Sequence, residues 1–235
     1  MVRIKISSKN FKKVIGETVE VIKMGGVATV PTDTVYGLIA DATNEKAVRK
    51  IFKIKKRSLK KPIPIFVKDL KMAKSLAIIN KNQEKFLKKF WPGKVTVILK
   101  AKNTPHQKWW GVSKDKKIGL RIPNYKLVNI LLEKLNFPLT GTSANISGKP
   151  GSTKIREVLK QFENQFSTRS GGGQPDLILD AGNLKPSLPS TVIDASDISA
   201  STLRKTRRVD LENLEILREG EIPKEKIFKI LKQKK

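Results

Sequence analysis

The sequence contains no cysteine and a single histidine, His106, among its 235 residues. Without thiols there can be no disulfide framework, no cysteine nucleophile and no thiolate zinc site, and one histidine cannot form a histidine cluster for a metal ion. No apolar run approaches the roughly 18 residues that a membrane-spanning helix needs, and the first residues form no signal-peptide core. We therefore expect a cytoplasmic protein without membrane attachment.

Acidic residues are also scarce, because 21 Asp and Glu stand against 49 Lys and Arg, which gives a formal net charge of +28. A field of this sign attracts polyanions such as nucleotides, RNA or anionic membranes. A lysine-rich solvated surface that reflects genome composition or thermal adaptation would give the same count. The charge alone does not decide between these interpretations.

Strand-like and helix-like patterns alternate along the chain, and the length favours a single large domain. Strand patterns are short, β-branched runs, whereas helix patterns repeat apolar residues every three or four positions. The predicted strands are 27–30, 63–67, 94–99, 118–122, 139–142, 177–179 and 191–193, and the predicted helices are 8–24, 44–55, 82–90, 125–135, 153–161 and 221–235. This alternation predicts an α/β fold with some antiparallel pairing.

The segment 31–38 places two threonines, an aspartate and a tyrosine directly after a predicted buried strand. Ligands collect at the carboxyl ends of strands in open α/β sheets, so Thr32, Asp33, Thr34 and Tyr36 are candidates to bind a small polar substrate. A turn that only satisfies its own backbone remains the alternative.

Six cationic residues crowd into positions 53–61, at the end of a predicted helix. The helix C-terminus favours one or two cations, but six like charges cost free energy unless an anion binds beside them. A triphosphate would fit, and a solvated charge run is the alternative. The residues are Lys53, Lys55, Lys56, Arg57, Lys60 and Lys61.

The segment 142–148 offers hydroxyls and an amide after another predicted strand, and these groups suit hydrogen bonds to phosphate oxygens. It is no P-loop, because Pro150 follows Gly148-Lys149 where a P-loop has Ser or Thr.

Trp91-Pro92-Gly93 predicts a tight turn with the indole in the core. Trp109-Trp110 is either a stacking platform for a base or a loop anchor, and 167–175 is expected to be a mobile surface loop.

Taken together, these strings resemble the YrdC family of threonylcarbamoyl-AMP synthases from about residue 11 to residue 222. The matching strings are PTDTVYGL (31–38), KIKKR (53–57), KPIPIFV (61–67), WPGKVTVIL (91–99), IGLRIPN (118–124), TSANISGKPG (142–151), PSTVID (189–194) and ILREGEI (216–222). The resemblance implies an open, twisted, mixed α/β sheet with flanking helices around a basic concave surface. It also implies a catalytic domain over 1–222 and a short basic helix or tail over 223–235, without the extra C-terminal domain of longer synthases.

The implied reaction makes L-threonylcarbamoyl-adenylate and pyrophosphate from L-threonine, bicarbonate or carbon dioxide, and ATP with Mg²⁺. The product serves N6-threonylcarbamoyladenosine formation in tRNA through a threonylcarbamoyltransferase complex. The resemblance implies no protein metal site. It assigns catalysis to Lys55, Arg57, Ser143 and Asn145, ATP binding to Arg57, Lys61, Lys117, Ser143, Gly151 and Arg218, and threonine binding to Thr34, Phe66, Arg121, Gly141 and Ser190.

Arg121 is the natural partner of a carboxylate, because a guanidinium can bind it with two parallel hydrogen bonds. The chain departs from many relatives at four positions. Lys61 replaces an Asn, Phe66 a His, Lys117 a small hydroxyl residue and Thr142 a Pro. These departures bear on threonine selectivity more than on phosphate binding.

Three other functions stay open at this point. A non-catalytic protein of the same fold could bind double-stranded RNA or tRNA on its basic face, and it would lose affinity steeply with salt. The related carbamoyl-transfer domain of hydrogenase maturation factors is flanked by zinc-binding cysteines, which this sequence lacks. A YrdC paralogue with a different activity is the third possibility.

Overall fold

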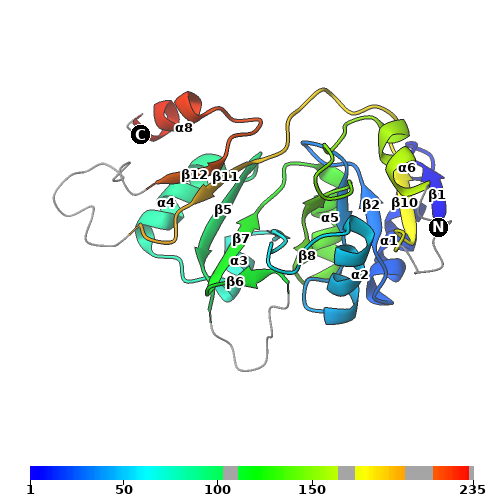
Figure 1. Cartoon of the computed structure of the whole chain (residues 1–235), viewed down its shortest axis with the longest axis horizontal. Helices are drawn as coiled ribbons and strands as arrows, with labels where there is room; N and C mark the ends of the chain where they lie inside the picture. Colours follow the sequence, from blue (N-terminus) through cyan, green and yellow to red (C-terminus); the bar gives the residue numbers. More distant parts are fainter. Residues whose placement is uncertain (103–110, 164–172, 199–213, 233–235) are drawn as a thin grey trace.

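The computed structural model describes residues 1–102, 111–163, 173–198 and 214–232. The expectations for His106, for Trp109-Trp110, for 167–172 and for the end of the tail, 233–235, lie outside these described residues. Within them the chain forms two mixed β-sheets with helices packed on both, and the two termini lie at opposite ends of the molecule (Figure 1). The expected α/β class with open mixed pairing is confirmed.

The first sheet contains five strands, and its order interleaves the two halves of the chain. That order is β1 (Val2–Lys5), β10 (Leu177–Asp180), β2 (Ala28–Val30), β3 (Gly37–Ile39) and β9 (Thr142–Ser143). The first three strands are parallel, whereas β3 runs antiparallel to both of its neighbours. The segment between β2 and β3, which the sequence singles out as a candidate, therefore starts at the carboxyl end of β2.

The second sheet has seven strands. Its order is β12 (Glu215–Arg218), β11 (Thr191–Asp194), β5 (Val95–Lys100), β7 (Lys117–Arg121), β4 (Ile65–Phe66) and β8 (Leu139–Thr140), with β6 (Ser113–Lys114) paired to β7. The strand predicted over 139–142 divides at Gly141. Its first half pairs with β4 in this sheet and its second half with β3 in the other sheet, so the chain crosses between the sheets at one glycine.

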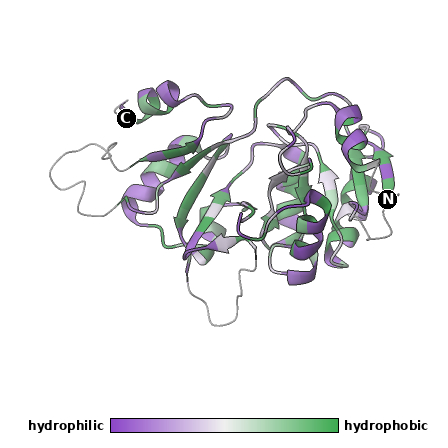
Figure 2. Cartoon of the chain, viewed as in Figure 1, coloured by the Kyte–Doolittle hydropathy of each residue, from purple (hydrophilic) through white to green (hydrophobic). Residues whose placement is uncertain are grey.

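Helices cover the sheets with their apolar faces. On one face of the five-stranded sheet lie α1 (Phe11–Lys23) and α5 (Lys126–Leu135), and on the other lie α2 (Glu45–Lys55) and α6 (Ile155–Glu163). The seven-stranded sheet carries α3 (Leu70–Leu76), α4 (Lys81–Phe90) and α8 (Lys224–Lys232), and Phe86 and Ile227 are fully buried there. Figure 2 shows the hydrophobic residues gathered on the strands and the inner sides of the helices.

Local sequence explains why these helices begin and end where they do. The Asn44 side chain accepts a hydrogen bond from the Ala47 amide and caps α2, and Asn80 with Gln83 forms a capping box at α4. Lys56 ends α2 in the left-handed conformation, with φ of 48°. This turn sends the following residue, Arg57, away from the helix axis.

Most predicted elements are present, and the elements that the sequence did not reveal are short. These are β1, β3, α3, β6 and β12. The predicted packing of Trp91 is confirmed, because its indole is buried and donates a hydrogen bond to the Val95 carbonyl. In the described part of the chain, every helix is too short or too polar to span a lipid bilayer.

Candidate active site

A cavity of about 230 Å³ lies where the two sheets meet. Its walls come from the segment after β2, from the loop before β4, from β5 and β7, from the crossing at 141–143, and from β11 and β12. Segments distant in sequence thus share one space. The polar or charged side chains in the lining are Thr32, Thr34, Tyr36, Arg57, Thr96, Arg121, Thr142, Ser143, Ser190 and Arg218. Within the described residues, this lining includes no Asp or Glu.

Two guanidiniums at the cavity, those of Arg57 and Arg218, form hydrogen bonds only to neutral groups. Arg57 donates from Nε to the Lys61 carbonyl at 2.8 Å and from Nη2 to the Pro62 carbonyl at 3.0 Å. Arg218 donates from Nη2 to the carbonyl of Ser190 at 2.7 Å. Neither arginine has a carboxylate partner among the ion pairs of the described residues. Their positive charge is therefore available to a bound anion.

The positive field of the cavity acts on the arginines themselves. Partial burial lowers the pKa of Arg218, and the nearby cations Arg121 and Arg57 lower it further. Burial likewise lowers the pKa of Arg57. An arginine stays protonated under all ordinary conditions. The lowered pKa values therefore mean that holding these positive charges in the cavity costs free energy, and a bound anion would reduce this cost.

The third guanidinium, Arg121, is buried and held by a carboxylate. Its Nη2 lies 2.6 Å from Asp33 Oδ1, and its Nε donates to the Gly93 carbonyl at 2.8 Å. Burial lowers the pKa of Arg121, and the charge of Asp33 opposes that effect. Asp33 also accepts from the Asn124 amide at 3.1 Å. Arg121 Nη1 points towards the Thr34 hydroxyl at 3.4 Å, on the cavity side.

Lys55, Ser143 and Asn145 meet beside the cavity. Lys55 is 1% exposed, and its Nζ donates to the Ser143 carbonyl, to the Asn145 carbonyl at 2.9 Å and to Asn145 Oδ1 at 3.1 Å. Burial lowers the pKa of Lys55 to about 7, and the cation of Arg57 adds to this effect. The structure thus joins the cationic segment at 53–57 to the polar segment at 142–148, as the sequence leads one to expect.

Hydroxyl groups form a second polar wall. Thr32 and Thr34 are buried with their hydroxyl oxygens 3.1 Å apart, and the Thr96 and Ser190 hydroxyls are 2.9 Å apart. The phenol of Tyr36 points elsewhere, because it donates to the Gly182 carbonyl at 2.8 Å. Burial raises the pKa of Tyr36 to about 12. The candidate role for the Tyr36 phenol in substrate binding therefore gives way to a structural one.

Phe66 and Gly141 form an apolar corner next to Arg121. A Cβ atom added to Gly141 would lie 2.5 Å from two ring carbons of Phe66, so a glycine is required at this close approach. The guanidinium carbon of Arg121 lies 5.7 Å from the centre of the same ring, within range of a cation–π interaction.

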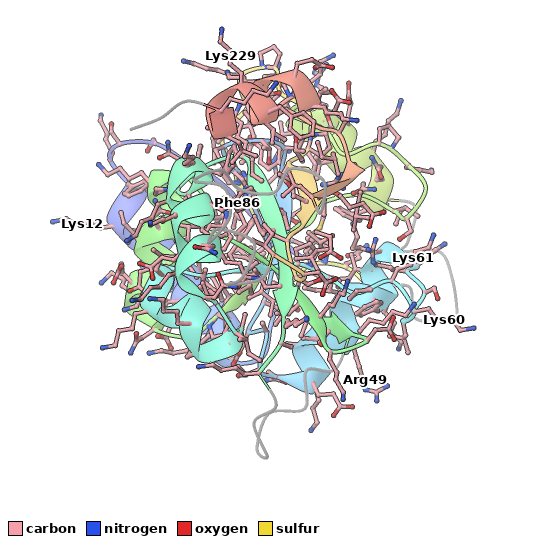
Figure 3. The ribbon with its side chains drawn as sticks, turned by 90° about the vertical axis from the view of Figure 1, so that its left-hand side faces the viewer. Lys12, Arg49, Lys60, Lys61, Phe86 and Lys229 are labelled. Carbon is pink, nitrogen blue, oxygen red and sulfur yellow. The ribbon has the colours of Figure 1, made fainter. Side chains whose placement is uncertain are left out.

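Three residues expected at ATP lie outside the cavity lining. Lys61 is exposed, and Figure 3 shows its side chain extending to the outside of the molecule beside Lys60. Lys117 forms an ion pair of 2.8 Å with Asp194, whose carboxylate raises the pKa of the lysine. Gly151 lies behind Ser143, since an added Cβ would be 3.1 Å from the Cβ of that serine.

The sequence did not reveal what three groups of the site do. Thr96 is part of a strand pattern, and nothing in that pattern marks it as facing a cavity. The Gly93 carbonyl holds Arg121, although the turn at 91–93 has a structural explanation of its own. Asp33 belongs to a candidate segment, but its pairing with Arg121 spans 88 positions in the sequence.

The chain is similar to known proteins of one family. A family model described as "Telomere recombination" (Sua5/YciO/YrdC) matches residues 20–206. A protein of Methanocaldococcus jannaschii is 37% identical over 201 residues, which cover 85% of this chain and 89% of the relative. The threonylcarbamoyl-AMP synthase of Pyrococcus abyssi is 33% identical over 185 residues, which cover 78% of this chain and 51% of that protein.

The fold is similar to that of a solved structure. Pyrococcus abyssi Sua5 in complex with L-threonine superposes with a TM-score of 0.79 at 28% sequence identity. The match covers 98% of this chain and 60% of the solved one. The chain therefore spans between 51% and 60% of the length of the Pyrococcus abyssi protein, whereas it covers most of the Methanocaldococcus jannaschii relative.

Proposed function

The chain belongs to the Sua5/YciO/YrdC family, and from this premise we propose that it forms L-threonylcarbamoyl-adenylate and pyrophosphate from L-threonine, bicarbonate or carbon dioxide, and ATP. One observation carries the proposal. Three guanidiniums and several hydroxyls line a cavity whose described walls have no acidic side chain. Such a cavity suits a substrate that is both highly anionic and rich in hydrogen-bonding groups.

Arg57 and Arg218 would bind the phosphates of ATP. Their charges have no carboxylate partner among the described residues, and the planar guanidinium matches the geometry of phosphate oxygens. Lys117 would bind the phosphates only after it leaves its ion pair with Asp194. Lys61, which is exposed, would also have to change position. Gly151 would act indirectly, by leaving room for Ser143.

L-threonine would lie near Arg121, whose remaining contacts on the cavity side are the Thr34 hydroxyl and the Phe66 ring. The carboxylate of the substrate would bind the guanidinium of Arg121, and its hydroxyl would form hydrogen bonds with Thr34 or Ser190. Its methyl group would face the apolar corner of Phe66 and Gly141. A relative supports L-threonine as the ligand, because Sua5 of Pyrococcus abyssi was crystallised with it.

The reaction would need no protein nucleophile. The amine of threonine captures carbon dioxide, and an oxygen of the resulting carbamate attacks the α-phosphorus of ATP, from which pyrophosphate leaves. Negative charge moves onto the departing phosphate oxygens, where fixed guanidiniums stabilise it without reorganising. Catalysis would then consist of positioning and cationic stabilisation, which agrees with a sequence that lacks cysteine.

Magnesium would enter with the nucleotide. In the described part of the chain no group of three His, Cys, Asp or Glu side chains could hold a metal ion, and Asp33 is taken by Arg121. Magnesium commonly binds to substrate phosphates with few protein ligands. We therefore propose that Mg²⁺ reaches the site as its complex with ATP.

The adenylate would be passed to a threonylcarbamoyltransferase complex that modifies tRNA. The net charge of +28 also suits direct contact with tRNA or double-stranded RNA, which is a binding role that can coexist with catalysis. An RNA-binding protein without activity would not release pyrophosphate. That difference decides between the two functions.

A pyrophosphate-release assay tests the proposal. Purified protein is incubated with threonine, bicarbonate and the magnesium complex of ATP, and each substrate is left out in turn. Pyrophosphate is expected only when all three are present, because the carbamate is the nucleophile. Release without threonine, or no release with the full set, would contradict the proposal. Heat-inactivated protein and serine in place of threonine serve as controls.

A further inference from the structure

The side-chain amide of Asn145 has one defined orientation. Its Nδ2 donates to the carbonyl oxygens of Ile146 at 2.9 Å and of Lys149 at 2.6 Å. The opposite orientation would place the amide oxygen against two carbonyl oxygens, with no hydrogen between them. Oδ1 therefore faces the other way, towards Lys55 and Ser143.

Lys55 fixes the same orientation from the opposite side. In its protonated form Lys55 carries only donors, and one of its three acceptors is Asn145 Oδ1 at 3.1 Å. The other two acceptors are the carbonyls of Ser143 and Asn145. Because three acceptors surround three hydrogens and the side chain is 1% exposed, Lys55 has no bond left for a molecule in the cavity. It acts as a positioning residue.

The hydroxyl of Ser143 is polarised by this arrangement. Its Oγ lies 2.5 Å from Asn145 Oδ1, which can only accept, so the single hydroxyl hydrogen lies on this bond. The lone pairs of Oγ remain, and Ser143 is part of the cavity lining. The side chain therefore offers the cavity an acceptor.

We propose that Ser143, oriented by Asn145 and Lys55, accepts a hydrogen bond from an N–H or O–H group of the bound substrate and does not contact a phosphate oxygen. A phosphate oxygen is itself an acceptor, and two acceptors without a shared hydrogen repel each other. In the proposed function the phosphates bind instead to the guanidiniums of Arg57 and Arg218, which line the same cavity. The inference rests on the proposed function for the identity of the substrates.

Several groups on the proposed substrates could be the donor. The nitrogen of threonine carries hydrogens as the amine and as the carbamate, its side chain carries a hydroxyl, adenine carries an exocyclic amine, and the ribose carries two hydroxyls. All present the same chemistry to Ser143, a hydrogen directed at a neutral oxygen. The experiment below separates them.

The test compares Ser143→Ala with the unmodified chain by titration calorimetry. Inorganic triphosphate, ATP and L-threonine are titrated separately, with and without Mg²⁺. Inorganic triphosphate has phosphate oxygens but no adenosine, so its affinity should change by less than about twofold. The ligand that carries the donor should bind about two- to twelvefold more weakly, which is the loss expected for one hydrogen bond. Ser75→Ala, a distant exposed serine, is the matched control.

Analogues then identify the donor. If ATP is the affected ligand, its 2′-deoxy and 3′-deoxy forms and purine riboside triphosphate, which lacks the exocyclic amine, are titrated next. The analogue that lacks the donor should bind equally to the unmodified chain and to Ser143→Ala. If threonine is the affected ligand, 3-hydroxybutyrate, which lacks the amine, and O-methylthreonine, which lacks the hydroxyl hydrogen, take the place of these analogues.

A variant of Asn145 tests the positioning role. Asn145→Ala releases the hydroxyl hydrogen, which can then turn to a phosphate oxygen, so the preference for ATP over inorganic triphosphate should fall by severalfold. A general structural effect would weaken both ligands alike and would not move this ratio.

Several results would overturn the inference. These are a tenfold loss of inorganic triphosphate binding in Ser143→Ala, no change for any of the three ligands, or a loss confined to titrations with Mg²⁺, which would make the serine a metal ligand. Failure of the unmodified chain to release pyrophosphate would instead overturn the proposed function. The binding titrations do not depend on turnover, so the two failures are distinguishable.

Discussion

Arg121 and Asp33 form an ion pair of 2.6 Å in which the side chains are 4% and 8% exposed. The pair fixes one of three guanidiniums at the cavity and leaves the two others without a carboxylate among the described residues. Asp33→Asn would leave Arg121 as a buried charge without its counterion. We expect a loss of about 3–5 kcal/mol in the free energy of unfolding, measured by urea denaturation. Asp115→Asn, at an exposed position, should change it little, and equal losses in both variants would contradict this account.

Arg121 should set the affinity for threonine. Arg121→Ala removes the guanidinium that would bind the carboxylate, so the KM for threonine should rise at least about tenfold. Arg121→Lys should restore little of it, since an ammonium cannot bind the substrate carboxylate and Asp33 in the same fork geometry. The KM for ATP serves as the internal control and should change less. An unchanged KM for threonine would refute the role.

Arg57 and Arg218 should act on the phosphates. Arg57→Ala or Arg218→Ala should lower kcat for pyrophosphate release by about 10²-fold or more, because stabilisation of transition-state charge is lost. Both variants should keep the fold, as both side chains bond mainly to neutral carbonyls. Arg49→Ala on the outer surface of α2 is a suitable control. Full activity in both variants would remove these arginines from the mechanism.

Gly141 should tolerate no side chain while Phe66 is present. Gly141→Ala would bring its Cβ to within 2.5 Å of the ring, and such overpacking typically costs about 1–3 kcal/mol. Adding Phe66→Leu should recover part of the loss in unfolding free energy, because the smaller side chain makes room. A double variant that is no more stable than Gly141→Ala alone would show that the strain arises elsewhere.

The pKa of Lys55 predicts a pH-dependent stability. Burial lowers this pKa from 10.5 to about 7, so between these values the unfolded chain binds more protons than the folded chain. The free energy of unfolding should therefore rise with pH over this window, by at most about 1.4 kcal/mol per pH unit. Three oxygen acceptors around Nζ favour the ammonium and reduce the slope. Lys55→Met lacks the effect, so urea midpoints of the two proteins should diverge from pH 7 to pH 10; parallel curves would contradict the prediction.

Patterns along the chain predict the elements whose signal is local. Helix α2 follows from its apolar spacing, and strand β2 from a short β-branched run. Short strands such as β3 and β12 escape prediction because pairing, and not composition, makes them strands. The division of 139–142 between two sheets depends on partners far away in sequence. The membership of the family expected from the motifs is confirmed.

The candidate site, too, could be predicted only in part from the sequence. Motifs pointed to Arg57, Arg121, Ser143, Ser190 and Arg218, and the structure brings all five to one cavity. The motifs do not indicate what each side chain already contacts. Lys55 lies among protein acceptors with no bond left for the cavity. The direction of a hydrogen bond depends on groups that the fold assembles, so only coordinates can supply it.

The single-residue step between β8 and β9 has a mechanical consequence. Thr140 pairs with Ile65 in the seven-stranded sheet and Thr142 with Leu38 in the five-stranded sheet, and the Thr140 amide also donates to the Ala40 carbonyl at 2.9 Å. Hydrogen bonds to both sheets and the Phe66 ring against Gly141 therefore hold this crossing in place. We expect the spacing between Arg121 and Ser143, which lie on different sheets, to depend on how the two sheets pack against each other.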